Sequence, residues 1–172
     1  PRLSSAASDV YKRQALEGLV IGGMTWFFEV GLDLPGIGIL AAFLTFMILA
    51  SMIAIYRAGL IRWDRNLAIA VYSSFFAIIL IYIFSIIGAV TGLFQVPYIH
   101  DATPLGIAFS LFVVGIGALC LVADFDFIER GVQMGAPKQL EWRAAFGLMV
   151  TLIWLYLEIL ELLAKIAIYS RR

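Results

Sequence analysis

The feature that most constrains this chain is a run of twenty residues, from Ile37 to Tyr56, that contains no charged side chain. A helix of about 20 residues, rising about 1.5 Å per residue, crosses the roughly 30 Å hydrocarbon core of a bilayer. Two further runs, residues 67–87 and 105–123, are also uncharged. A chain of 172 residues cannot hide several such helices in one soluble core. We therefore predict an all-α, polytopic transmembrane helix bundle.

Turn and charge signals divide the chain into about five spans. Pro35 and Gly36 mark the first reversal, Pro104 is expected to open the fourth span, and Pro137 the last long helix, which runs through Lys165. The expected spans are residues 15–30, 37–56, 67–87, 105–123 and 143–165. Together they form one transmembrane domain over residues 15–172.

The first fourteen residues differ from all that follows. The stretch SSAASDVYKRQ, Ser4 to Gln14, looks like the in-frame translation of a transposase adapter used in preparing sequencing libraries. We exclude residues 1–14 from fold reasoning as artefactual or disordered, as one excludes a fusion scar. On this interpretation the biological sequence begins near Ala15 and is truncated upstream.

Composition excludes several classes of function. Hydrophobic residues make up 63% of the chain, the formal net charge is zero, and no basic block is present. We therefore expect the lipid bilayer, and no nucleic acid, as a partner. His100 is the single histidine and Cys120 the single cysteine, so neither a histidine-rich metal site nor a Ser-His pair is available within the bundle. We expect no enzyme activity and no cofactor.

Lysine and arginine favour one orientation. Six of them flank the second and fourth connections, against three on the opposite side, and cytoplasmic loops carry the basic excess. The six are Arg57, Arg62, Arg65, Arg130, Lys138 and Arg143, and the three are Lys165, Arg171 and Arg172. The second and fourth connections are therefore expected in the cytoplasm.

Acidic residues within apolar sequence are the candidate functional groups. A carboxylate in the middle of a membrane costs several kcal/mol unless it is protonated, hydrated or paired. Glu158 lies deep in such sequence, and function and a satisfied structural carboxyl are equally good interpretations of it. Glu161 is four residues before Lys165, the favourable order for an ion pair, so an interfacial pair is the preferred interpretation there.

A second acidic stretch follows the fourth span. Composition favours a solvated loop for Asp126 and Glu129, whereas Asp124 adjoins the apolar run, so that a continued helix would place it in a cavity. If Asp124 approached Glu158, the two carboxyls would share one proton. Protonated, they would close the helices; deprotonated, they would repel and attract a hard cation such as Ca²⁺.

Two segments carry a resemblance to a known family. DFDFIERG at Asp124–Gly131, followed by WLYLEILELL at Trp154–Leu163, resembles the paired motifs that close the Bax inhibitor-1 family, most closely its bacterial branch, and the resemblance covers essentially residues 15–172. It implies a seven-helix bundle with the last helix surrounded by the other six, two helices being lost upstream here. It also implies a pH-sensitive calcium leak whose sensor acids fall on Asp124 and Glu158, the second being Glu where the family has Asp.

The spacing of the two acids departs from the family pattern, because thirty-four residues separate them. A simple hairpin turning at Gly135–Pro137 would offset Asp124 and Glu158 by about 15 Å, so they meet only if the intervening segment forms an additional surface helix.

Our interpretation is therefore a proton-regulated Ca²⁺ leak in a bacterial plasma membrane, sensed by Asp124 and Glu158, with Ca²⁺ and protons as partners. The alternatives are an interaction or scaffold membrane protein and a secondary transporter. Four further acids are accessory candidates: Glu17, Glu29, Asp126 and Glu161.

Overall fold

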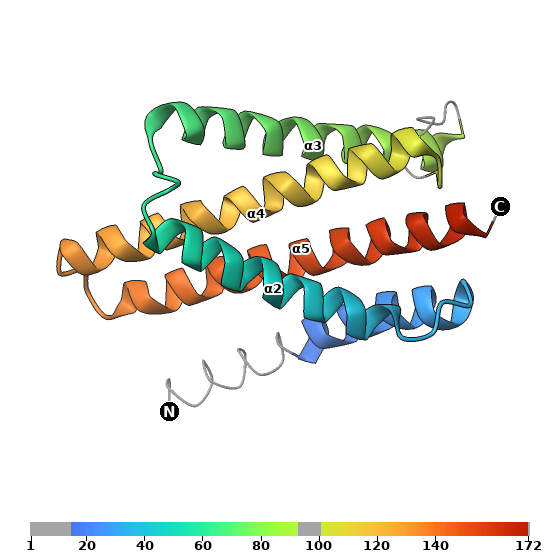
Figure 1. Cartoon of the computed structure of the whole chain (residues 1–172), viewed down its shortest axis with the longest axis horizontal. Helices are drawn as coiled ribbons and strands as arrows, with labels where there is room; N and C mark the ends of the chain where they lie inside the picture. Colours follow the sequence, from blue (N-terminus) through green and yellow to red (C-terminus); the bar gives the residue numbers. More distant parts are fainter. Residues whose placement is uncertain (1–14, 93–100, 172) are drawn as a thin grey trace.

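A computed structural model describes residues 15–92 and 101–171 of the chain (Figure 1). Residues 1–14 and His100 lie outside the described residues, so the interpretation of the first as an artefact stays a prediction. Within the described residues the structure is helical and contains no strand, which confirms the all-α prediction.

Four long helices follow a short N-terminal helical segment. Residues 15–26 are helical and continue into the π-helix η1 (Phe27–Gly31). The long helices are α2 (Ile37–Arg57), α3 (Arg65–Thr91), α4 (Pro104–Gln133) and α5 (Gln139–Ser170). Each contains an apolar stretch, with mean hydropathy from 1.9 to 2.6, that is long enough to cross a membrane. The four therefore correspond to the second to fifth expected spans, while the first expected span coincides with the N-terminal helical segment.

Helix starts agree with the turn signals in the sequence. The Asp64 carboxylate accepts a hydrogen bond from Leu67 N at 2.7 Å and caps α3. Pro104 occupies the first turn of α4, as predicted, and the Thr103 hydroxyl accepts from Gly106 N at 3.2 Å. Helix α5 begins two residues after Pro137.

The solvated loop expected for Asp126 and Glu129 was wrong. Helix α4 continues ten residues beyond Ala123, so Asp126 and Glu129 lie on its last turns and not in a solvated loop. No proline interrupts this stretch, and Asp126 forms an ion pair with Arg130 one turn later at 2.7 Å, which suits a helix. Helix α3 likewise extends to Thr91, past the expected end at Ile87.

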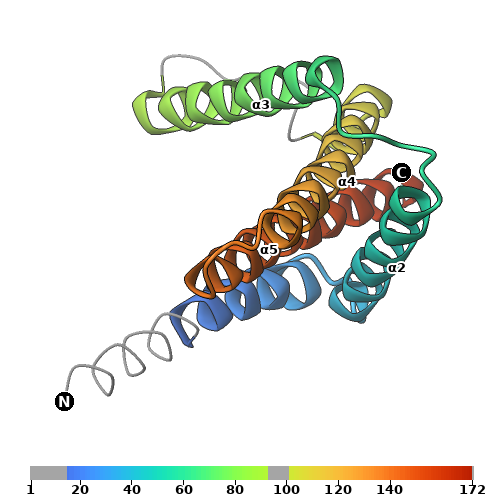
Figure 2. The same cartoon turned by 90° about the vertical axis from the view of Figure 1, so that its left-hand side faces the viewer.

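The antiparallel hairpin of α4 and α5 is the centre of the bundle, with α2 packed on both helices and α3 packed on α4 (Figures 1 and 2). The turn of this hairpin lies at the same end as the last residues of α2 and the first residues of α3. We call this end the hairpin side, and the end where α5 finishes and α4 begins the opposite side. The six basic residues expected on one side all belong to helix ends or connections of the hairpin side.

Close packing of α4 on α5 depends on Gly117. A methyl group added there would lie 3.0 Å from Leu155 Cδ1 and 3.4 Å from Trp154 Cζ3. Leu155 and Leu121 are both 0% exposed and belong to the same buried cluster. The absence of a side chain at Gly117 thus lets two large α5 side chains approach the α4 backbone.

We predict that Gly117→Ala lowers the stability of the bundle by about 1–3 kcal/mol, the usual cost of overpacking a close contact. Gly115→Ala is the matched control, because nothing lies within 4 Å of a methyl group at that position on the same helix. Thermal unfolding in detergent, followed by circular dichroism, measures both. Equal melting temperatures for the two variants would contradict the close packing at Gly117.

Candidate ion-sensing site

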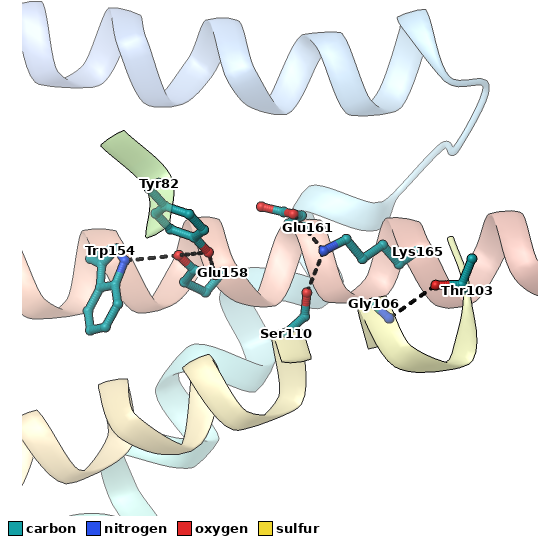
Figure 3. A network of polar contacts seen from close by, with 8 residues as sticks. All are labelled: Tyr82, Thr103, Gly106, Ser110, Trp154, Glu158, Glu161 and Lys165. Atoms are coloured by element: carbon teal, nitrogen blue, oxygen red, sulfur yellow. Dashed lines mark hydrogen bonds and ion pairs between the residues drawn. The ribbon is translucent and has the colours of Figure 1, made fainter. Parts of the chain in front are cut away.

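Glu158 lies inside the bundle, on the face of α5 that meets α3 and α4. The residue is 5% exposed. Its carboxyl accepts a hydrogen bond from the Tyr82 hydroxyl of α3, which is 3.0 Å from both oxygens, and another from Trp154 Nε1 at 3.0 Å (Figure 3). Two donors from two helices therefore converge on this one acid.

The surrounding residues fix these two donors. Trp154 lies one turn before Glu158 on α5, and its ring meets Phe75 of α3 edge-on at 5.2 Å between centroids. The Tyr82 ring meets Phe109 of α4 in the same way at 6.5 Å. A buried carboxyl is costly unless its oxygens are hydrogen-bonded, and bonds to a charged acceptor are stronger than neutral ones. The hydrogen bond from Tyr82 to Glu158 thus joins α3 to α5 among side chains that are otherwise apolar.

The predicted ion pair between Glu161 and Lys165 is confirmed, with Lys165 Nζ 2.7 Å from Glu161 Oε1 (Figure 3). Lys165 is only 4% exposed and donates a second bond to Ser110 Oγ of α4 at 2.7 Å. The Lys165 ammonium therefore lies between the helices of the bundle. Glu158, Glu161 and Lys165 form a polar tract that runs from mid-helix toward the opposite side.

Asp124 occupies a separate place on α4. Its carboxyl lies beside the Thr151 hydroxyl and 3.7 Å from the position of a methyl group added at Gly147, both on α5. Asp124 Oδ2 is buried and has no hydrogen-bond partner among the described residues. The hydroxyl of Thr151 donates to the Gly147 carbonyl oxygen at 3.1 Å. Asp124 is thus a weakly satisfied acid at the α4–α5 contact.

The structure does not bring Asp124 and Glu158 together. The α5 residue beside Asp124, Thr151, precedes Glu158 by seven residues, or about 10 Å along the helix. A short turn joins α4 to α5 without an additional surface helix, so the two acids are offset as expected for a simple hairpin, although by about 10 Å and not by about 15 Å. Within the described residues no group of three or more His, Cys, Asp or Glu side chains is arranged to hold a metal. A proton or a Ca²⁺ ion shared directly by the two acids is therefore not supported by this geometry.

The accessory acids have local structural partners. Asp126 pairs with Arg130, as described above. Glu29 Oε1 accepts from Gly38 N at 3.1 Å and so satisfies a free backbone N–H in the first turn of α2. Glu17 lines a groove between the N-terminal helical segment and Ile153 and Leu157 of α5. None of these three approaches the Glu158 contacts.

Sequence reasoning missed the partners of Glu158, which are Trp154 and Tyr82, and the Ser110 partner of Lys165. Trp154 had a signal, because a residue four positions earlier shares a helix face with the acid. Tyr82 and Ser110 had none, because each lies in an uncharged run on another helix and only the packing of α3 and α4 brings them to α5.

We predict that Tyr82→Phe destabilises the bundle by about 1–3 kcal/mol, because it leaves a buried carboxyl with one donor fewer. Tyr72→Phe is the matched control, since that residue is on the same helix with an exposed side chain. Chemical unfolding in detergent, followed by tryptophan fluorescence, compares the two. A Tyr82 variant as stable as the Tyr72 variant would show that the bond to Glu158 does not hold α3.

Comparison with known proteins places the chain in a family. The family model described as "Bax inhibitor 1 like" matches residues 3–168, a range that contains the described helices except for the last two residues of α5. Neither a search of curated proteins nor a search of solved structures returns a match. The chain, a multi-pass membrane protein, therefore belongs to the Bax inhibitor 1 like family, as the closing motifs suggested.

Proposed function

We propose that this protein is a proton-regulated cation leak, conducting Ca²⁺, in which Glu158 is the principal sensing group. The observation that carries the proposal is the burial of this carboxyl at the contact of three membrane-spanning helices, with donors from α3 and α5. An ionisable residue inside a membrane bundle is commonly part of an ion or proton pathway. A bacterial plasma membrane is the location that accords with this role.

Proton binding at Glu158 changes both its charge and its hydrogen bonds. Ionised, the carboxylate accepts from Tyr82 and Trp154 and attracts a hydrated cation through its field. Protonated, it is neutral, and one of its oxygens becomes a donor. The attraction for a cation is lost as pH falls, so the leak is expected to rise with pH.

The nearby charges sharpen this dependence. Glu161 is one turn from Glu158, and its charge is compensated by Lys165 at 2.7 Å. The net charge of the tract therefore changes from minus one to zero when Glu158 takes up a proton. A single protonation then decides whether the interior attracts a cation.

Asp124 is a secondary group in this proposal, since it does not contact Glu158. It lies on the hairpin side of the site, where its charge adds to the field that attracts a cation entering from that side. Asp124→Asn is therefore expected to lower the rate of Ca²⁺ release and to leave the dependence of this rate on pH unchanged.

We predict that wild-type protein in liposomes releases Ca²⁺ faster as pH rises, and that Glu158→Gln releases it slowly at every pH, because the amide cannot ionise. Release is followed with an indicator dye outside Ca²⁺-loaded vesicles. Glu141→Gln is the matched control, an identical exchange in the exposed first turn of α5. It is expected to behave as wild type.

The alternative functions give different results in the same assay. A scaffold protein shows no leak that depends on these acids. A secondary transporter shows flux that saturates with one solute. Either result would refute the proposed leak.

A further inference from the structure

Between the two acids the polar contacts are interrupted by apolar side chains, which we call the apolar layer: Phe75, Gly117, Leu121, Trp154 and Leu155. On α4 the layer lies between Ser110 and Asp124, and on α5 it lies between Thr151 and Glu158. Leu121 and Leu155 are both 0% exposed. Leu155 and the Trp154 ring lie against Gly117, and the Phe75 ring packs edge-to-face with the Trp154 ring.

Polar groups continue away from this layer in both directions. Toward the opposite side, Glu158 is followed by Glu161 and by Lys165 with its bond to Ser110 (Figure 3). Toward the hairpin side, Asp124 is followed by the Asp126–Arg130 pair and by Glu129, which accepts from the Tyr56 hydroxyl.

Cavities accompany the polar groups on the hairpin side. One of about 260 Å³ is lined by Tyr56, Trp63, Asp126 and Glu129 among others. Another of about 570 Å³ reaches Phe125 and Leu148, the immediate neighbours of Asp124 and Gly147. Both volumes exceed the roughly 30 Å³ that one water occupies in the liquid. The first cavity is lined by the carboxylates of Asp126 and Glu129 and by the Tyr56 hydroxyl, which suit water. The second is lined mostly by apolar side chains, with Glu129, Tyr56 and Arg57 as its polar lining.

From this arrangement we infer that the apolar layer is the closed constriction of the ion pathway. Asp124 and Glu158 then face the aqueous phases on opposite sides of this layer. Asp124 is reached from the hairpin side and Glu158 from the opposite side. That ions cross the bundle at this layer rests on the proposed function, whereas the existence of the apolar barrier does not depend on it. Apolar constrictions of this kind close a pore by excluding water.

The physical argument is the cost of a charge beside fully packed hydrocarbon. A hydrated ion that moves from Asp124 to Glu158 would pass about 10 Å along α5. Between Thr151 and Glu158, α5 offers two polar side chains, the Trp154 N–H and the Tyr156 hydroxyl, and the hydroxyl is hydrogen-bonded to Thr25 at 2.7 Å. That N–H is already bonded to Glu158. An ion without ligands in an apolar medium is strongly disfavoured, so this layer blocks conduction unless the helices separate.

The test is sided labelling of introduced cysteines in a Cys120→Ser background, using membrane vesicles of known and of inverted orientation. The probe is a charged, membrane-impermeant methanethiosulfonate, and modification is read by mass spectrometry. We expect Thr151→Cys to react only from the hairpin side and Glu161→Cys only from the opposite side. If Glu161→Cys does not fold, Ser110→Cys takes its place. Reaction of either cysteine from both sides, or of both from the same side, or of neither, would overturn the inference.

A second variant tests the layer itself. Leu155→Ser introduces a hydroxyl and a space between the acids, so Thr151→Cys is expected to become reactive from both sides. Leu155→Met, which keeps an apolar side chain of similar volume, is expected to retain one-sided labelling. Unchanged labelling in the serine variant would show that Leu155 is not part of the barrier.

The labelling result is independent of any ion flux, so a protein without a leak can still have each of the two cysteines labelled from one side only. In liposomes, Leu155→Ser is expected to raise Ca²⁺ release at acidic pH severalfold. Absence of pH-dependent release in wild type together with one-sided labelling would remove the proposed function and keep the barrier. A pH-dependent leak in a wild-type bundle whose cysteines react from both sides would keep the proposed function and remove the barrier.

Discussion

The bundle depends on how a carboxyl group is accommodated where water is excluded. Glu158 meets this constraint with two hydrogen-bond donors, one supplied by its own helix one turn earlier and the other by α3. The first donor costs little, because Trp154 is already on the same helix face. The second requires α3 to lie at one height against α4 and α5, so an acid on α5 helps to fix the position of a helix whose outer surface is largely exposed apolar side chains.

The register of the α4–α5 hairpin follows from contacts that repeat along it. Ser110 meets Lys165, Gly117 admits Leu155, and Asp124 lies beside Gly147 and Thr151. A small or polar residue on one helix thus faces a large or charged residue on the other at successive levels. Sliding one helix by a turn would place Lys165 against Val114 and Asp124 against Leu155. The same contacts that stabilise the hairpin therefore separate its two acids.

Much of this architecture could be predicted from the sequence, and the failures have physical causes. Uncharged runs and proline positions predicted the long helices, and the i, i+4 spacing predicted the Glu161–Lys165 pair. The loop expected at Asp126 and Glu129 was wrong because charge was taken to mark the end of a helix, whereas the Asp126–Arg130 ion pair stabilises its continuation. The interior position of Lys165 and the role of Tyr82 depend on interhelical packing, which periodicity within one helix does not encode.

The separation of Asp124 from Glu158 changes how the two acids can influence each other. Two carboxyls that share a proton would respond together, because each would feel the charge of the other directly. Here the nearest charged groups to Glu158 are Glu161 and Lys165 on its own helix, and Asp124 is screened from it by the buried side chains of Leu121 and Leu155. Coupling between the acids must then pass through movement of the helices that carry them, since α4 and α5 are held by the same packed layer. A proton taken up on one side can influence a cation on the other only by altering that packing.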